Sequence, residues 1–397
     1  RSPARIGGVK QLREGAAQRK MPSRMPLMFR RALLGATLAG PALAQGAGEL
    51  RVGALFPAAS LLADEALRGV ELAVEERGAT RPTRLIRAEA GDPAQAAAEA
   101  RRLIQAERCG VIFGSVGTAA ALAAGMAAET LDTLYVEVVT PTDALTERGA
   151  RLFIRPVPRA AAYGVQAAGA LTRFLPARLN LPADALRVAV LHESGGAAEA
   201  IGLACEAQLR EAGLAVVERL SHVPRTSEMP ALTQRLRAAG IAVLLHAAGE
   251  GDAAALLRAM EEAGWRPRAL IGVGSAWALA QAPGLEGSFA LDVPPIASAE
   301  AWATGAQPFA EAYQRRWGAA PRSGLSLAAF AVARPVLATP QRATLAALDV
   351  AEGGLANGWG FRLDERGQNG RAQPVLMQWR QGRPVAVWPE EAAFTPP

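Results

Sequence analysis

Residues 111–118 read VIFGSVGT, an apolar run that ends in small residues. The run Val111–Phe113 predicts a short buried strand, and Thr118 opens an alanine-rich helical stretch. The first amide groups of a helix have no partners inside that helix, and the helix dipole adds partial positive charge there. Such a helix start attracts an anion. The sequence therefore predicts an anion-binding helix N-terminus that includes Ser115, Gly117 and Thr118.

Short apolar runs alternate with helical spacing on both sides of this stretch. Three more predicted strands, Leu50–Leu55, Arg84–Ala88 and Leu134–Val139, belong to the same series. A second series begins at Arg187–His192 and ends at Ala269–Val273. Strands separated by helices imply a parallel sheet with right-handed crossovers. Two such series, in a chain long enough for two cores, predict two similar α/β lobes.

The pattern differs in two other places. The segment 171–185 contains two prolines and is expected to be a connecting turn region. Beyond Gly287 we expect a strand near 288–293, then helices near 306–317 and 326–338. Three short apolar runs with turns between them predict a terminal antiparallel set at 361–363, 375–379 and 384–388.

The chain carries an export signal near its beginning. Residues 28–44 read MFRRALLGATLAGPALA, with a basic pair, a short apolar run and a small-x-small site at Ala42–Ala44. The apolar run is too short to span a bilayer. We expect export and cleavage after Ala44, by either the general or the twin-arginine route. The alternative is an ordinary N-terminal helix.

Charge and cysteine content narrow the function further. The pI of 10.1 is due to residues 1–44, which hold nine Lys and Arg residues and one acid, so the net +6 of the chain becomes −2 after Ala44. Nucleic acid is therefore not an expected partner. No lysine follows Lys20, which excludes a P-loop or Schiff-base lysine. Cys109 and Cys205 fall in different predicted lobes, so two separate buried thiols are expected although export permits a disulfide.

The sequence does not favour an enzyme. No serine lies in G-x-S-x-G, and the three histidines, His192, His222 and His246, have no metal-ligand spacing. G-x-G-x-x-G and C-x-x-C are also absent. We therefore expect no catalytic residues, no metal and no cofactor.

Several segments resemble one family, the leucine/isoleucine/valine-binding proteins. Its N-terminal lobe is resembled by LRVGALFP at 50–57, GVELAVEE at 69–76 and GDPAQA at 91–96. Its second lobe and C-terminal end are resembled by VAVL at 188–191, AGW at 263–265, VLMQW at 375–379 and VAVWP at 385–389. Each segment is a weak signal alone, but their order and spacing are specific.

This resemblance implies a type I periplasmic binding fold, with two doubly wound parallel-sheet lobes joined by three crossover segments. It implies a monomeric periplasmic receptor that holds a small-molecule ligand in an interlobe cleft and feeds the membrane subunits of an ABC importer. The expected division is a leader over 1–44, an N-terminal lobe over 45–158 plus 286–338, and a C-terminal lobe over 159–285 plus 339–397. The crossings are expected near 157–161, 281–287 and 337–342.

The resemblance also implies cleft residues in the first lobe. Thr118, preceded by Gly117, falls where the family holds the ligand carboxylate, and a hydroxyl at a helix start suits that role. The alternative is a threonine that only caps its own helix. The next family contact falls on Pro141, so a slip of one residue brings in Thr140 or Thr142. Thr140 before a proline is equally well explained as a cap.

In the second lobe the sequence departs from the family. The aromatic expected after His192 is replaced by Gly195-Gly196-Ala197, and Ser275 stands where an acid would hold the ligand ammonium. Because a buried ammonium without an acid is costly, a carboxylate or amide without a cation is favoured over a free α-amino acid. Glu193 or Glu250 could replace the missing acid.

Four further residues, Phe56, His192, His246 and Trp277, could line the pocket. Core packing for Trp277 and strand-end positions for the histidines are equally good explanations. Two functions stay open: a solute receptor for an importer, and a non-transport sensor or interaction protein on the same fold.

Overall fold

The structure, a computed structural model, describes residues 48–297 and 303–390. They belong to one compact unit that begins at Gly48. The expected signal segment and its cleavage site after Ala44 lie outside the described residues. Within the described ranges, no helix has both the length and the apolarity needed to cross a membrane.

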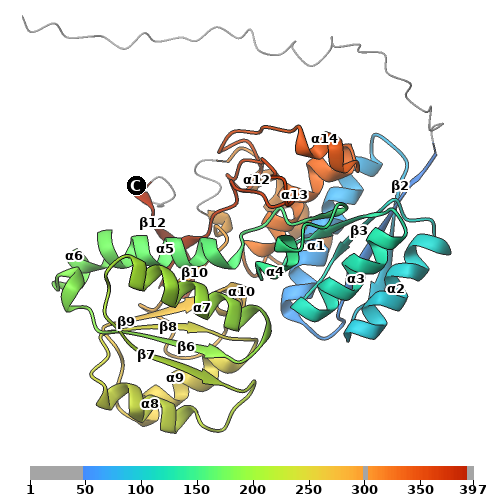
Figure 1. The fold of residues 1–397 in the computed structure, drawn as a ribbon. Coiled ribbons are helices and arrows are strands. Elements are labelled where there is room, and N and C mark those ends of the chain that lie inside the picture. The colour runs from blue at the N-terminus through green and yellow to red at the C-terminus, as the bar shows by residue number, and fades with distance from the viewer. Residues whose placement is uncertain (1–47, 298–302, 391–397) are drawn as a thin grey trace, which may run out of the picture. The chain divides into compact units, whose positions relative to one another are not determined.

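The first sheet has five parallel strands in the order β2-β1-β3-β4-β5. Helices α2 and α3 cover one face, and α1, α12 and α13 cover the other (Figure 1). The strands are β1 (Leu50–Phe56), β2 (Thr83–Glu89), β3 (Val111–Gly114), β4 (Leu134–Glu137) and β5 (Phe153–Ile154). The helices are α1 (Leu61–Gly78), α2 (Pro93–Gln105), α3 (Thr118–Thr130), α4 (Ala144–Glu147), α12 (Ala306–Trp317), α13 (Leu325–Ala338) and α14 (Arg342–Ala346).

Local sequence explains where these helices begin and how closely they pack. Asp92 caps α2 by accepting from the Gln95 amide, and Pro93 occupies the first helical position. Ser60 caps α1 in the same way. Gly69 lets α1 approach α13, because a Cβ there would lie 2.1 Å from the Ser326 carbonyl oxygen.

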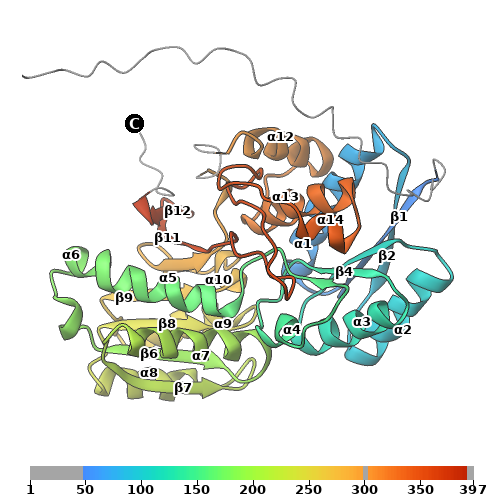
Figure 2. The same cartoon turned by 45° about the horizontal axis from the view of Figure 1, so that its top comes forward.

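The second sheet has seven strands in the order β12-β11-β10-β9-β8-β6-β7. Helices α5 and α7 pack on one face and α8 and α9 on the other (Figures 1 and 2). The strands are β6 (Val188–Glu193), β7 (Val216–His222), β8 (Val243–Ala247), β9 (Ala269–Val273), β10 (Phe289–Asp292), β11 (Val375–Arg380) and β12 (Arg383–Trp388). The helices are α5 (Ala160–Arg173), α6 (Leu175–Leu179), α7 (Gly196–Glu211), α8 (Met229–Ala238), α9 (Asp252–Glu262) and α10 (Ser275–Ala278), with a 3₁₀ turn at Ala183–Ala185.

The structure confirms the two α/β lobes and the antiparallel pairing of the runs at 375–379 and 384–388, and it corrects two other expected elements, at 171–185 and 361–363. β11 and β12 form an antiparallel hairpin beside the parallel strand β10, so the second sheet is mixed. The segment 171–185 is largely helical, because α5 continues to Arg173 and Pro176 sits at the start of α6, where proline is tolerated. Phe361 belongs to no strand, since it pairs with Val350 in an isolated bridge.

The chain crosses between the lobes at positions that differ in part from those expected. The first crossing, at 155–159, lies near the expected 157–161. The second follows Asp292 rather than lying at 281–287, because β10 pairs with β9 inside the second sheet. The third is at 373–374 rather than 337–342, because Leu345, Trp359 and Phe361 are buried in the core of the first lobe.

The observed crossings also place the boundaries of the lobes at other residues than the expected ones. Residues 289–292 lie in the second sheet and not in the first lobe, where the division at 286 puts them. Residues 345–372 contribute to the first core and not to the second lobe.

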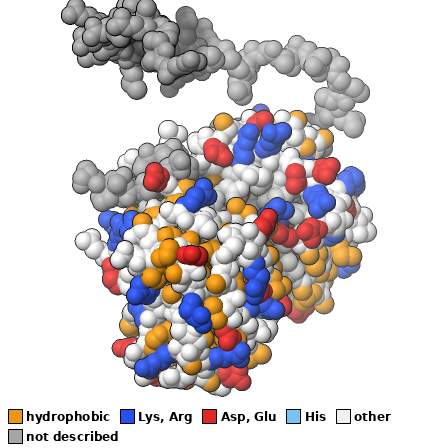
Figure 3. Space-filling model, turned by 60° about the vertical axis from the view of Figure 1, so that its left-hand side comes forward, with side chains coloured by type: hydrophobic (Ala, Val, Ile, Leu, Met, Phe, Trp, Pro, Cys, Tyr) orange, Lys and Arg blue, Asp and Glu red, His pale blue; other side chains and the backbone are white. Residues whose placement is uncertain are grey.

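Arginine and acidic side chains are interspersed over the face seen in Figure 3, with apolar side chains between them. That mixture fits the near-neutral balance of the chain after Ala44.

Candidate functional site

A cavity of about 460 Å³ lies where the strands of both sheets end. Ligands of α/β sheets bind outside the carboxyl ends of the strands, in loops such as these. The first lobe contributes Leu62, Val116, Gly117, Val139, Thr140 and Pro141, and α5 contributes Tyr163. The second lobe contributes Glu193, Ser194, Gly195, Gly196, Ala197, Ala198, Ile201, Ala248, Gly249, Val273, Gly274, Ser275 and Ala276.

The first-lobe wall is built around the start of α3. Gly117 precedes that helix with φ 99°, no side chain caps the helix, and the space where a Cβ would point is open. Thr140 Oγ1 accepts from the Gly117 amide at 3.2 Å. Gly117 and Thr140 thus line the cavity as predicted. The hydroxyls of Thr118 and Thr142 instead bond to each other at 2.7 Å, and neither residue is part of the lining.

A buried carboxyl group, that of Glu137, fixes these two loops beneath the cavity. Glu137, at the end of β4, accepts from the amides of Ser115 (2.9 Å), Val139 (2.9 Å) and Thr140 (2.8 Å). Burial raises the pKa of Glu137 to about 8, although these backbone hydrogen bonds lower it. Ser115 is fully buried and acts through its backbone here. We did not predict a role for Glu137; the one available signal was a lone acid at the end of an apolar strand.

Arg155, in the first crossing, holds the neighbouring loop in place. Its side chain is fully buried and donates to Gln368 Oε1 at 2.6 Å, to Thr146 Oγ1 at 3.2 Å and to the Thr142 carbonyl. Asp143 is its charged partner, at 3.4 Å. Burial lowers the pKa of Arg155 to about 10. The loop after β4 is thereby anchored to the hinge side of the molecule.

The second-lobe wall carries acceptor groups. Glu193 lines the cavity and accepts from the Gly249 amide through Oε2 at 2.8 Å. Ser275 lines it too, and its hydroxyl donates to Asp292 Oδ1 at 2.9 Å. The Tyr163 hydroxyl donates to the same oxygen at 3.0 Å. Sequence reasoning missed Tyr163 and Asp292, because no local pattern distinguishes them.

Asp292 itself is completely buried behind this wall. Burial raises its pKa to about 6, against the hydrogen bonds from Ser275 and Tyr163, which lower it. The start of α7, after Gly195, also reaches the cavity and has no side-chain cap. The cavity is therefore lined by an uncapped helix start from each lobe.

The remaining predicted residues lie away from the cavity lining. Phe56 lines a separate hollow of about 350 Å³ on the first lobe. His192 is buried, with Nδ1 3.0 Å from the Glu193 carbonyl oxygen. Trp277 is buried against His246, with ring centroids 5.6 Å apart, and covers Gly272. For Trp277 and His192, core packing is the role that the structure supports.

His246 also pairs with a second histidine, His222. Its Nε2 lies 3.1 Å from Nε2 of His222. His222 Nδ1 bonds to the Val223 carbonyl oxygen, an acceptor only, so Nδ1 carries the hydrogen and Nε2 accepts from His246. Burial lowers the pKa of His246 well below its ordinary range. Over the described ranges, no three His, Cys, Asp or Glu side chains are placed to hold a metal ion.

Glu250 links the lobes at the edge of the cleft rather than lining it. Its Oε1 accepts from Ser60 Oγ at 2.8 Å and from the Leu62 amide at 2.9 Å. Glu250 precedes α9 of the second lobe, whereas Ser60 and Leu62 form the start of α1 in the first lobe. This acid therefore stabilises the arrangement in which the two lobes meet.

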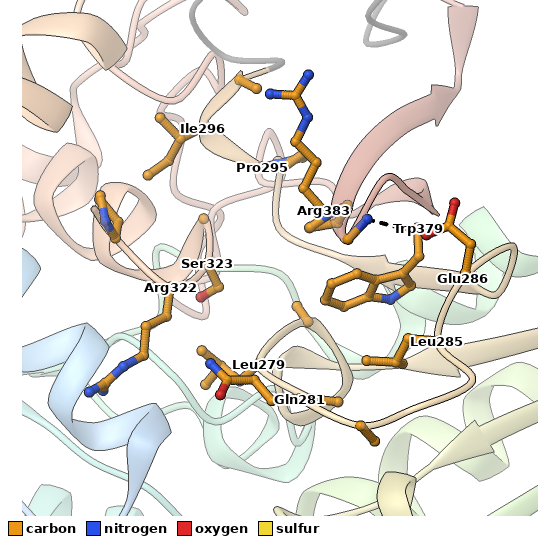
Figure 4. Close-up of a pocket in the computed structure, with 18 of the residues that line it drawn as sticks. Leu279, Gln281, Leu285, Glu286, Pro295, Ile296, Arg322, Ser323, Trp379 and Arg383 are labelled. Atoms are coloured by element: carbon orange, nitrogen blue, oxygen red, sulfur yellow. Dashed lines mark hydrogen bonds between the residues drawn. The ribbon is translucent and has the colours of Figure 1, made fainter. Parts of the chain in front are cut away.

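A larger cavity, about 640 Å³, lies between residues 278–286, 295–297, 321–324 and 379–384 (Figure 4). Two of its charged side chains already have partners. Arg322 turns toward α1 and donates to Asp64 at 2.9 Å, while Glu286 accepts from the amides of Gln381 and Gly382 at 3.0 and 3.2 Å. Because no loop after β3, β4, β6 or β8 lines it, the smaller cleft is the better candidate site.

Two α/β lobes, three crossings and a cleft at the strand ends define a two-lobed binding protein of type I. Comparison with known proteins agrees: residues 49–353 match the family model described as periplasmic binding protein. The chain is 32% identical over 376 residues to Leu/Ile/Val-binding protein homolog 7 of Brucella abortus (strain 2308), covering 89% of this chain and 94% of that one. It belongs to the periplasmic binding protein family, among the relatives of the Leu/Ile/Val-binding proteins.

Solved structures share the fold at low sequence identity. LivJ of Streptococcus pneumoniae in complex with isoleucine superposes with a TM-score of 0.70 at 16% identity, over 85% of this chain and 98% of that one. A solute-binding protein of Rhodopseudomonas palustris in complex with benzoate gives 0.68 at 18% identity, over 86% and 96%.

Proposed function

We propose that this protein captures a small carboxylate-bearing solute in the cleft and delivers it to the membrane subunits of an ABC importer. The observation that carries the proposal is one cavity of about 460 Å³ lined by uncapped helix starts from both lobes, after Gly117 and Gly195. Such helix starts favour a negatively charged group. Isoleucine and benzoate, named with the two neighbours above, both carry a carboxylate.

The way in which the two lobes are connected supports the same role. The crossings at 155–159, 293–295 and 373–374 are the only connections between the described parts of the lobes, which pack separate cores. Closure of two lobes around a ligand is a common mode of conformational change. The Glu250 contacts with Ser60 and Leu62 show groups that meet across the edge of the cleft when the lobes approach.

A thermal-shift panel tests the proposal. Leucine, isoleucine, benzoate and their primary amides are added to the purified protein, because a ligand that binds only the folded state raises the melting temperature. We expect a carboxylate to raise it and the matched amide to do so less. Ala197→Phe, which fills the cavity, should abolish the shift. Ala212→Phe, at the exposed far end of α7, should leave it unchanged. Failure of the whole panel would contradict the proposal.

Transport is tested separately from binding. Uptake of the best-binding probe is compared in cells with and without the gene. Import that depends on the gene supports a receptor for an importer. Binding without any effect on uptake would instead support a sensor on the same fold.

We further propose that the mature protein is a periplasmic monomer that begins at Gln45. Mass spectrometry of the periplasmic fraction should give a chain without residues 1–44. Size-exclusion chromatography with light scattering should give the mass of one copy. A full-length mass, or a cytoplasmic location, would contradict the export hypothesis.

A further inference from the structure

The loop after β4 lines the cleft through Pro141 and the two residues before it, and it also contacts the second lobe. The Ala160 amide donates to the Pro141 carbonyl oxygen at 2.7 Å, and the Ala161 amide donates to Asp143 Oδ2 at 3.2 Å. These two amides begin α5, which packs in the core of the second lobe. A loop of the first lobe therefore caps a helix of the second lobe.

The start of α5 needs such a partner. The residue before the helix, Arg159, provides no side-chain cap, and the first amides of a helix have no acceptors inside it and carry partial positive charge. Asp143 supplies a carboxylate to this helix start. Hydrogen bonds to two consecutive amides fix the direction of the helix as well as its position. Rotation of the second lobe away from the loop must therefore lengthen at least one of them.

The opposite side of Asp143 is held by the first lobe. Its Oδ1 lies 3.4 Å from Nη2 of Arg155. The buried side chains of Gln368 and Asn369, from the first lobe, donate to two carbonyl oxygens of the same crossing at 3.0 and 3.1 Å. The beginning of the crossing is thus bound to the first lobe, and the bend between the lobes falls at 158–159, directly before α5.

The contact between Asp143 and α5 lies between two walls of the cleft. Pro141 lines the cavity on one side and Tyr163, in the first turn of α5, lines it on the other. Asp143 itself is not one of the described residues that line the cavity.

We infer that Asp143 is a positioning residue, which joins the cleft loop of the first lobe to α5 of the second lobe and so sets the angle at which the two walls face a solute. This inference rests on the proposed function, because it gives Asp143 a part in solute capture without contact to the solute. It predicts that loss of Asp143 loosens the angle between the lobes and weakens the binding of every cleft ligand alike.

A distance measurement without ligand tests the first part. Met126→Cys on α3 and Leu203→Cys on α7 place one spin label on each lobe, at side chains that are 58% and 44% exposed, in a protein whose Cys109 and Cys205 are replaced by alanine. Pulsed electron paramagnetic resonance then gives the distribution of distances between the lobes. Asp143→Ala should broaden this distribution, because one of the two hydrogen bonds to the start of α5 is lost.

Titration calorimetry with L-leucine and with benzoate tests the second part. Asp143→Ala should weaken the binding of both probes by the same factor, about tenfold, because Asp143 touches neither. Asp143→Asn keeps one acceptor oxygen, so it should broaden the distribution less and weaken binding less. This variant keeps the test informative if Asp143→Ala fails to fold.

Asp92→Ala is the matched control. It removes an aspartate that caps a helix inside the first lobe, where Asp92 accepts from the Gln95 amide at 2.9 Å. It should lower the melting temperature without changing either affinity or the distribution of distances between the lobes.

The outcomes separate the inference from the proposed function. An unchanged distribution in both Asp143 variants would overturn the inference and leave a solute receptor standing. Unchanged affinity for both probes, or a loss for one probe only, would also overturn it, because a positioning residue affects all cleft ligands. If the distribution broadened but neither probe bound the unsubstituted protein, the proposed function would be contradicted, and the role of Asp143 in setting the lobe angle would be supported.

Discussion

At Glu137 burial and hydrogen bonding act in opposite directions. Burial disfavours the charged carboxylate, whereas the amides of Ser115, Val139 and Thr140 favour it. The pKa of about 8 shows that burial is the larger effect. The folded protein therefore holds a proton on Glu137 at pH values where the unfolded chain has lost it.

This difference predicts how stability depends on pH. Because the folded-state pKa of Glu137 is raised from 4.5 to about 8, the free energy of unfolding should fall as pH rises between these values. The slope from one such group is at most about 1.4 kcal/mol per pH unit. Burial raises the pKa of Asp292 from 3.8 to about 6, so its titration should also lower the free energy of unfolding as pH rises, over a lower pH range. Urea denaturation from pH 4 to 9 measures the curve.

Glu137→Gln should remove most of the slope above about pH 6. It should also cost about 1–3 kcal/mol at pH 7, because the glutamine NH₂ group must face at least one amide that now finds an acceptor. Glu147→Gln, at an exposed position on α4, is the matched control and should change neither quantity. Stability that rose with pH from 5 to 8 would contradict this account of Glu137.

At the scale of the element, Gly272 in β9 allows the Trp277 side chain of α10 to pack directly on the strand. A Cβ at Gly272 would lie 2.0 Å from the Trp277 ring, well inside van der Waals contact. Gly272→Ala should therefore push Trp277 out of its site and destabilise the protein by about 3 kcal/mol or more. Chemical denaturation, with tryptophan fluorescence as the probe, measures the loss. Gly110→Ala, where the nearest atom would be 3.5 Å from the new Cβ, should change stability by less than about 0.5 kcal/mol.

The start of α1 provides a prediction for the cleft edge. Glu250 accepts from Ser60 Oγ and the Leu62 amide, so it adds negative charge at a helix N-terminus as well as a contact between lobes. Glu250→Ala should raise the dissociation rate of the best-binding probe about tenfold, equivalent to about 1.4 kcal/mol. Stopped-flow release measures it. Glu250→Gln keeps an acceptor oxygen and should have a smaller effect; equal effects of the two variants would show that only the charge matters.

At the scale of the whole molecule, local periodicity was enough to predict the alternating elements. β3 and α3 appear close to the expected residues, because a buried apolar run and a helix start that follows small residues are both local patterns. The second and third crossings were misplaced, because the pairing of β10 with β9 and the burial of Trp359 are contacts between distant segments. Such contacts leave no local pattern.

The residues of the candidate site likewise fall into those that the sequence identifies and those that it does not. Gly117 and Thr140 could be found from the sequence, because a helix start and the loop after the next strand are local features. Ser275 and Glu193 could be found from the family pattern. Tyr163 and Asp292 could not, since their shared hydrogen bonds join α5 to β10, 129 residues apart in the chain. His192 and Trp277 were placed in the pocket by sequence proximity, whereas their strand and helix direct them into the core.

The two cysteines, one in each lobe, allow the lobes to be observed separately. Cys109 and Cys205 are free and buried in different cores, and burial raises their pKa values to about 11 and about 12. Because the thiolate is the reactive species, neither should react with a thiol reagent until its own lobe opens. The free, buried state of both cysteines confirms the expectation of two separate thiols, and it makes each thiol a reporter of local opening of its own lobe.

In moderate urea and without ligand, we expect Cys109 and Cys205 to react with a thiol reagent at two different rates, because the described cores of the two lobes are separate. A saturating cleft ligand contacts both lobes, so it should slow both reactions and bring the rates together. Cys109→Ala and Cys205→Ala, each leaving one thiol, assign the rates by mass spectrometry. Identical rates without ligand would mean that the lobes open as one cooperative unit. Protection of Cys205 alone would mean that the ligand binds the second lobe without closing the cleft.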